Sequence, residues 1–192
     1  DQPAPADLPA SPDRPPGRDG GPFLVADIGG GSTEFVDGTA HISVNIGCVR
    51  ITERHLAGDP PAEAEIAAAT ADIDAALDET AAAVRVSEAR TLVGLAGSVT
   101  TIAGIALGLD HYDSRRIHHS RVPAGQVHEI SRRLLAQTRA QRAAIGVMHP
   151  GRVDVIAAGA LILDRVMTRF GFDQVLVSEH DILDGLAWSL AQ

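Results

Sequence analysis

The feature that most constrains the fold is a turn of three consecutive glycines between two short apolar segments. The turn, Gly29–Gly31, follows Phe23–Ala26 and precedes Ser32–Val36, and both segments are typical of short strands. Glycine tolerates positive φ angles, so we expect the turn to direct several backbone N–H groups at one anion. The hydroxyls of Ser32 and Thr33 are expected to add donors. A plain hairpin, in which the glycines only close a tight turn, is the alternative.

Two carboxylates bracket this turn, because Asp27 precedes the glycines and Glu34 follows them. A carboxylate beside a bound phosphate is electrostatically unfavourable unless a cation or an acid–base role offsets it. A bound Mg²⁺ ion is the cation that we expect to offset this repulsion. A dinucleotide-binding fingerprint is excluded, because the turn leads into a strand and Glu34 stands where the third glycine would be.

A second glycine turn, Gly94–Thr101, follows the apolar strand Thr91–Leu95 and opens a helix. Exposed N–H groups at the start of a helix form an anion site that the helix dipole assists. A simple N-cap by Ser98 is the alternative. Two such turns in one small domain favour a phosphate ligand.

The chain is expected to hold one α/β domain behind a linker. Residues 1–21 are rich in Pro, Asp, Ala and Gly and cannot bury enough apolar surface to fold, so they are predicted to be a linker or disordered tail. The domain is predicted to open with three antiparallel strands, the second and third joined by a hairpin turn at Asp37-Gly38. A mixed sheet flanked by helices follows from the order of the remaining elements. Strands are predicted at 23–26, 32–36, 42–46, 91–95 and 174–177, and helices at 61–84, 99–107, 122–138, 153–170 and 182–190.

Composition narrows the chemistry. All 16 basic residues are arginine, which excludes a Schiff-base lysine and the phosphate-binding lysine of a P-loop. The net charge of −9 argues against nucleic-acid binding, although residues 111–170 carry 10 Arg against 4 acids. This basic stretch is typical either of an anion-binding surface or of a solvated helix face. The sequence has neither a membrane-spanning apolar run nor a secretory signal, so we expect a cytoplasmic protein without membrane contacts.

The single cysteine and the histidines show no metal-ligand spacing. Cys48 is expected to be a buried packing residue. His118 and His119 are adjacent, so their rings are expected to point to different sides.

Five stretches of the sequence carry a family resemblance when they are taken together and in order: Asp27–Glu34, Gly47–Glu53, Gly94–Thr101, His149–Gly159 and Ser178–Gly185. The first alone is similar to the second phosphate loop of the sugar kinase, Hsp70 and actin superfamily. The joint pattern resembles the exopolyphosphatase and guanosine-pentaphosphate phosphatase (Ppx/GppA) family. It implies a ribonuclease H-like (actin-like ATPase) α/β domain over residues 22–192.

The resemblance also implies a hydrolase of acid anhydrides that removes the terminal phosphate of polyphosphate or of guanosine pentaphosphate, a nucleotide of the stringent response. Asp27 and Glu34 would hold Mg²⁺, and Glu34 would position or activate the attacking water. Arg152 stands where the family places a basic residue. Its role would be either to contact the anion or to support the start of a helix. The phosphate-binding residues implied are Gly29, Gly30, Gly31, Ser32, Thr33, Gly97, Ser98 and Arg152.

Family members begin with another lobe, which carries its own phosphate loop and the main candidate for the general base. The sequence from Asp1 to Gln192 does not contain that lobe, and the substrate cleft of the family lies between the lobes. We therefore expect this chain to be the C-terminal lobe, to hold half of an active site and to be inactive alone, and the full-length protein to be a homodimer. The alternatives are a non-catalytic module that senses polyphosphate or the alarmone, and a sugar kinase or chaperone-like ATPase lobe.

Overall fold

Three antiparallel strands at the start of the domain form one half of a six-stranded sheet. The structure is a computed structural model that describes residues 21–180. The strands are β1 (Phe23–Ile28), β2 (Thr33–Val36) and β3 (His41–Val44). Buried and half-buried residues alternate along β1 and β2, as expected for a sheet with one face on the core. Between β2 and β3, Gly38 adopts a φ of +87°, which accounts for glycine in this turn.

The other half of the sheet is built around two parallel strands. β4 (Thr91–Leu95) and β6 (Gln174–Val177) run parallel to β1, and the short edge strand β5 (Arg121–Pro123) pairs antiparallel with β6. The strand order is β3-β2-β1-β4-β6-β5. The prediction of a mixed α/β sheet that opens with three antiparallel strands is confirmed.

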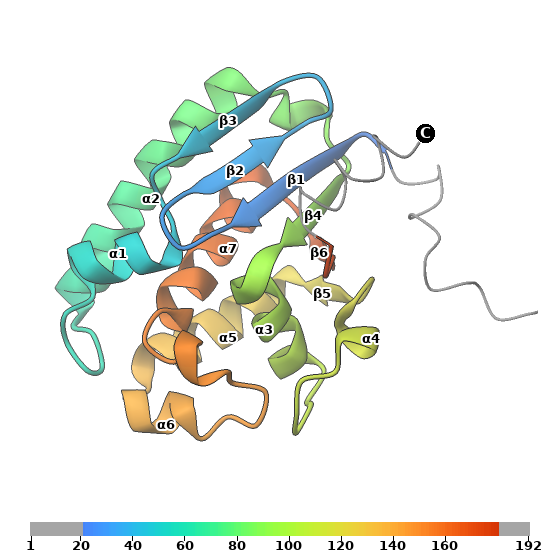
Figure 1. Ribbon diagram of the computed structural model, residues 1–192. Coiled ribbons are helices and arrows are strands. Elements are labelled where there is room, and N and C mark those ends of the chain that lie inside the picture. The colour runs from blue at the N-terminus through green and yellow to red at the C-terminus, as the bar shows by residue number, and fades with distance from the viewer. Residues whose placement is uncertain (1–20, 181–192) are drawn as a thin grey trace, which may run out of the picture.

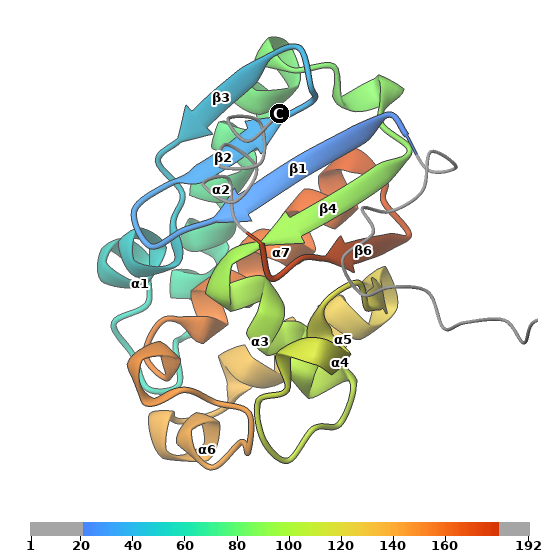
Figure 2. The ribbon, with the colours of Figure 1, turned by 45° about the vertical axis from the view of Figure 1, so that its right-hand side comes forward.

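Helices flank this sheet, and Figures 1 and 2 show α2 and α7 along one face while α3 begins where β4 ends. The Phe35 and Phe170 rings meet edge to face with their centroids 6.1 Å apart and join the end of α7 to β2. Among the helices of residues 21–180, none is both long and apolar enough to cross a membrane. The helices are α1 (Cys48–His55), α2 (Glu63–Ala83), α3 (Ala96–Ala106), α4 (Ser114–Ile117), α5 (Ala124–Ala136), α6 (Arg139–Ala143) and α7 (Ile156–Phe170), with 3₁₀ turns at Val86–Glu88 and Pro150–Arg152.

Several element boundaries differ from the predictions. The helix predicted over 122–138 is wrong at its start, because residues 121–123 form β5 and α5 begins at Ala124. An edge strand of three residues that ends in proline is too short to show alternation. The strand predicted over 42–46 is shifted and ends at Val44. The predicted linker and the closing helix over 182–190 lie outside the described residues, except for Gly21.

The parallel strands bring distant parts of the sequence together at one edge of the sheet. Asp27 of β1 pairs with Leu95 of β4, and Gly94 of β4 pairs with Val177 of β6. The segments that follow these carboxyl ends therefore lie side by side. In open α/β sheets this edge is where ligands bind.

Candidate functional site

The glycine loop at the end of β1 is held by the first turn of α1. The N–H of Gly29 donates to the carbonyl of Ser32 (3.0 Å), and the N–H of Cys48 donates to the carbonyl of Gly29 (2.9 Å). Gly30 accepts in the same way from Val49 (2.9 Å). These bonds satisfy N–H groups that a helix start leaves unpaired, and they turn the loop's carbonyls toward α1.

The expectation of positive φ angles in Gly29–Gly31 is wrong, because the glycines with positive φ among residues 21–180 are Gly38, Gly108 and Gly171. Close packing requires glycine at a different position, Gly47. A methyl group on Gly47, just before α1, would overlap the backbone of Gly30.

The exposed side of the glycine loop presents backbone N–H donors and lies beside an arginine side chain. Within the described chain, no residue accepts a hydrogen bond from the N–H of Gly30 or of Gly31, and both glycines are exposed. Arg50 of α1 donates from Nε to the carbonyl of Gly31 (2.7 Å), which places its guanidinium beside the loop. Of the three glycine N–H groups that were predicted to point at one anion, those of Gly30 and Gly31 can do so, because the N–H of Gly29 donates within the loop. Sequence reasoning missed Arg50 as a site residue.

The two carboxylates lie on the same face of the sheet. Asp27 and Glu34 are directly opposite each other in the β1–β2 register, as predicted from their flanking positions. The Oε1 atom of Glu34 accepts hydrogen bonds from the hydroxyls of Ser32 (2.5 Å) and Ser43 (2.7 Å). No described residue donates to Oε2 of Glu34. The carboxylate is therefore oriented through one oxygen, while the other can bind a water or a cation.

Thr33 lies on the other face of β2, so its predicted role as a hydroxyl donor to phosphate is wrong. Its side chain is fully buried, and its hydroxyl donates to the carbonyl of Ile46 (2.7 Å). Neighbouring strand residues point to opposite faces, which is why Thr33 and Glu34 cannot both face the ligand.

The second turn places a guanidinium on the first turn of α3. The helix begins at Ala96, whose φ of 69° is unusual for a non-glycine residue and marks a strained site. A methyl group on Gly97 would overlap the Nη2, Cζ and Nε atoms of Arg152. Arg152 also donates from Nη1 to the hydroxyl of Thr101 (3.2 Å). Gly97 and Arg152, which are 55 positions apart in the sequence, are thus neighbours.

Ser98 is not the N-cap of α3, because the cap position is Leu95 and Ser98 lies inside the first turn. The side chain of Ser98 is buried, and a methyl group added to Gly159 would lie only 2.6 Å from the Cβ atom of Ser98. The same glycine faces Cys48, which is buried as predicted. The first turns of three helices therefore meet at this point, so Ser98 can contribute its backbone N–H to a ligand but has its side chain in the packing.

These features form one surface that suits a phosphate chain. The glycine loop and the turn at Gly97 follow adjacent parallel strands, each with exposed N–H groups or a helix start and each with one arginine, Arg50 or Arg152. Helix N-termini and guanidiniums both favour phosphate oxygens. The carboxylates of Asp27 and Glu34 adjoin this surface. Groups of three or more His, Cys, Asp or Glu residues that could hold a metal by themselves are not found among residues 21–180.

A pocket of about 430 Å³ adjoins Arg152. Its wall includes Tyr112 and Met148. The hydroxyl of Tyr112 donates to the carboxylate of Glu179 (2.7 Å) at the end of β6. Burial raises the pKa of Tyr112, and the Glu179 carboxylate acts in the same direction, so the phenol stays a hydrogen-bond donor at neutral pH.

Two adjacent imidazoles lie at the same edge, and their arrangement corrects a prediction. The rings of His118 and His119 are stacked with centroids 3.7 Å apart, and His180 meets His118 at 4.8 Å. His119 has a φ of 62°, so the regular alternation of side chains does not apply there. The expectation that the two rings point apart is therefore wrong.

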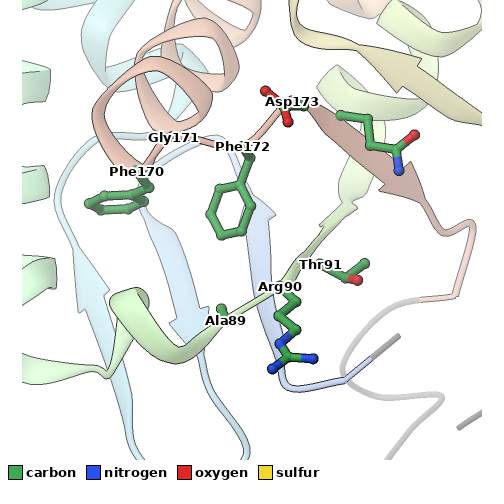
Figure 3. Close-up of a pocket in the computed structure, with 8 residues that line it drawn as sticks. Ala89, Arg90, Thr91, Phe170, Gly171, Phe172 and Asp173 are labelled. Atoms are coloured by element: carbon green, nitrogen blue, oxygen red, sulfur yellow. The ribbon is translucent and has the colours of Figure 1, made fainter. Parts of the chain in front are cut away.

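A second pocket, of about 180 Å³, lies at the opposite end of β4 and β6. Figure 3 shows the rings of Phe170 and Phe172 on one side of it and Arg90 on the other. This pocket is separated from the glycine loops by the length of the strands, so it is not part of the site.

Comparisons with known proteins agree on one family. The Ppx/GppA phosphatase family matches residues 18–192. Exopolyphosphatase 2 of Mycobacterium tuberculosis is 48% identical over 183 residues, which are 91% of this chain and 57% of that protein. A guanosine-5'-triphosphate,3'-diphosphate pyrophosphatase of Aeromonas salmonicida is 28% identical over 172 residues, 87% of this chain and 33% of that protein. The chain thus spans little more than half the length of the mycobacterial relative.

The solved structures give the same result. The crystal structure of an exopolyphosphatase-like protein superimposes with a TM-score of 0.87 at 37% identity, over 91% of this chain and 61% of that protein. The fold and the sequence motifs therefore agree.

Proposed function

This chain belongs to the Ppx/GppA phosphatase family, and we propose that it supplies one half of an active site that removes the terminal phosphate from inorganic polyphosphate, guanosine pentaphosphate or both. The observation that carries the proposal is the pairing of the two glycine turns at the ends of β1 and β4, each with its own arginine. The names of the two relatives, an exopolyphosphatase and a guanosine-5'-triphosphate,3'-diphosphate pyrophosphatase, support both substrates.

The phosphates would be bound by backbone groups and guanidiniums. The N–H groups of Gly30 and Gly31 and the first turn of α3 at Gly97 can donate to non-bridging oxygens. Arg50 and Arg152 would balance their negative charge. Because these donors are fixed by hydrogen bonds to α1 and by packing on Gly97, they need little reorganisation when charge develops in the transition state.

Glu34 would orient the attacking water. Its Oε1 atom is fixed by Ser32 and Ser43, and Oε2 can accept a hydrogen bond from water. A carboxylate held in this way orients a water for attack on the terminal phosphorus. In-line attack would release orthophosphate and leave a substrate that is one phosphate shorter.

Asp27 and Glu34 fit a Mg²⁺ ion that is bound together with the substrate. Mg²⁺ commonly takes one or two protein carboxylates and fills its other positions with water and phosphate oxygens. The two carboxylates face each other across β1 and β2, and the described residues supply no third acid to complete a cage. The bound ion would reduce the repulsion between the carboxylates and the phosphates.

The other half of the site would come from the part of the family's length that this chain does not span. A lobe with its own phosphate loop would close over the glycine turns, exclude water and supply the general base that the family resemblance places there. Without it, the phosphates stay solvated and each electrostatic contact is weak. We therefore propose that residues 1–192 bind phosphate chains weakly and do not turn them over. A non-catalytic module that senses the same ligands is the alternative.

Glu34→Gln tests the proposed role directly. Joined to a complementary family lobe, this variant should lose about 10²-fold or more in orthophosphate release with an unchanged melting temperature, because it keeps the shape and removes the charge that orients the water. Glu79→Gln on the exposed side of α2 is the matched control and should keep full activity. Unchanged turnover in Glu34→Gln would reject the role of Glu34.

A further inference from the structure

The guanidinium of Arg152 is held by a neutral oxygen atom. Its Nη1 atom donates to the hydroxyl of Thr101 at 3.2 Å, and among residues 21–180 this is the side-chain hydrogen bond that Arg152 makes. No carboxylate of the described residues forms an ion pair with the guanidinium, which is half-buried against the first turn of α3 at Gly97. A neutral acceptor orients a guanidinium without neutralising it, so the positive charge stays available to an anion.

The hydroxyl of Thr101 is itself fixed in position. Thr101 is fully buried in α3, and its hydroxyl donates to the carbonyl of Gly97, four residues earlier, at 2.7 Å. A hydroxyl has one proton to donate, so its lone pairs are what remains for Arg152. Branching at Cβ and the bond to the preceding turn restrict the rotamer of the side chain. The oxygen that receives Arg152 therefore has one position and acts as an acceptor.

The backbone that carries Arg152 is fixed from both sides. The ring of His149 accepts a hydrogen bond from the N–H of Gly151 (3.1 Å) and caps the 3₁₀ turn in which Arg152 lies. On the other side, the buried guanidinium of Arg142 donates from Nε to the carbonyl of Val153 (3.1 Å). The mobile part that remains is the side chain of Arg152, and its contact with α3 fixes the end of that side chain.

We propose that Thr101 is a positioning residue of the phosphate site, whose hydroxyl orients the guanidinium of Arg152 toward the phosphate oxygens. The inference rests on the proposed function and adds a residue that acts through Arg152, since the buried hydroxyl does not reach the ligand itself. An arginine side chain has many rotamers, and binding must order them at a cost in affinity. The bond to Thr101 provides part of this order before the ligand binds, so affinity should depend on the hydroxyl.

A role in helix stability alone is the alternative, and Thr80 of α2 allows the two to be separated. Thr80 is also fully buried, and its hydroxyl also donates to the carbonyl four residues earlier, that of Ala76, at 2.9 Å. No arginine among the described residues donates to it. Thr80→Val therefore removes the same kind of bond as Thr101→Val without affecting the orientation of Arg152.

Four variants of the 192-residue chain test the proposal without requiring turnover. Thr101→Val keeps the shape and removes the hydroxyl, and Thr101→Ser keeps the hydroxyl and removes the methyl group. Thr80→Val and Arg152→Ala are the controls. Calorimetry measures the affinity for tripolyphosphate, and urea unfolding measures stability. Nitrogen-15 relaxation of the Nε–Hε group of Arg152 measures the order of the side chain without ligand, and the absence of its signal in Arg152→Ala identifies it.

Thr101→Val should bind tripolyphosphate roughly three- to tenfold more weakly, and the Nε–Hε group of Arg152 should become more mobile. Thr101→Ser should stay within twofold of the wild-type affinity and keep the side chain ordered, although it also loses stability. Thr80→Val should lose stability and keep both wild-type affinity and an ordered Arg152. Added to Arg152→Ala, the Thr101→Val change should cause no further loss of affinity.

Equal losses of affinity in Thr101→Val and Thr101→Ser, or an Nε–Hε group as ordered in Thr101→Val as in the wild type, would overturn the proposal. Wild-type affinity in Arg152→Ala would overturn it as well, because it would remove the phosphate contact on which the proposal depends. Failure of the proposed hydrolysis would appear separately, as absent orthophosphate release by the chain joined to a complementary lobe, with the hydroxyl-dependent binding retained.

Discussion

Replacing Gly97 with alanine should expel Arg152 from the phosphate site while leaving the fold intact. The added methyl group would overlap three atoms of the guanidinium, so the arginine must withdraw by roughly 1 Å or more to reach van der Waals distance. Gly97 has no positive φ, so alanine fits the backbone of α3. The gain in helix propensity, about 0.5–1 kcal/mol, offsets the loss of the bond from Arg152 to Thr101.

The cost should therefore appear in binding and turnover. A charge-assisted hydrogen bond contributes about 1.5–3 kcal/mol, which corresponds to roughly 10- to 150-fold in affinity or in kcat/KM. Affinity for tripolyphosphate can be measured by calorimetry on the 192-residue chain, and kcat/KM on the chain joined to a complementary lobe. The free energy of unfolding should change by less than about 1 kcal/mol. Gly125→Ala is the matched control, since Gly125 is in α5 and nothing lies within 4 Å of an added methyl group.

A double-mutant cycle identifies the cause. If Gly97 matters because it seats Arg152, then Gly97→Ala and Arg152→Ala should each weaken binding, and the double variant should be no worse than Arg152→Ala alone. Losses that add in the double variant, or wild-type affinity in Gly97→Ala, would refute the reasoning.

Three further predictions concern the supporting structure. Thr33→Val should lower the free energy of unfolding in urea by about 1–3 kcal/mol, because the buried carbonyl of Ile46 loses its donor. Its affinity for tripolyphosphate should stay within twofold of the wild type. A loss of affinity as large as the loss of stability would show that Thr33 contacts the phosphates. Burial lowers the pKa of His119, and His180 acts in the same direction, so the unfolded chain binds the proton more readily and stability should fall as the pH drops below about 6.5. His119→Asn tolerates the left-handed backbone and should reduce this dependence between pH 7.5 and 5.5, and an unchanged slope would contradict it. Gly47→Ala should weaken both unfolding stability and phosphate affinity by pushing the glycine loop away from α1, whereas a variant with normal values for both would show that the loop adapts.

Five of the six strands of the described sheet could be predicted from the sequence, because each is a short apolar run with a clear boundary, whereas β5 was predicted as the start of a helix. β4 and β6 were predicted at residues 91–95 and 174–177, where the structure has them. The order of these strands could not be predicted from periodicity, since it depends on how the helices cross over. α1 was missed because its eight residues mix polar and apolar positions and follow a glycine instead of a side-chain cap.

The candidate site was predicted in part, because local motifs report local geometry. Asp27 and Glu34 flank a tight turn, and two residues in register on paired strands must share a face. Thr33 was misplaced because hydroxyl chemistry was weighed without the alternation of the strand. Arg50 and the contact between Gly97 and Arg152 depend on tertiary packing. A glycine just before a helix, or in its first turn, signals such close packing but does not identify the partner.

The central claim is that this chain holds one half of a shared active site. The most direct test is orthophosphate release from polyphosphate and from guanosine pentaphosphate, measured for residues 1–192 alone and together with the part of the mycobacterial exopolyphosphatase 2 that this chain does not cover. We predict no appreciable release by the chain alone, and Mg²⁺-dependent release when the two parts are combined. Turnover by residues 1–192 alone at the rate of a full-length relative would contradict the account, because it would require a complete site within this chain.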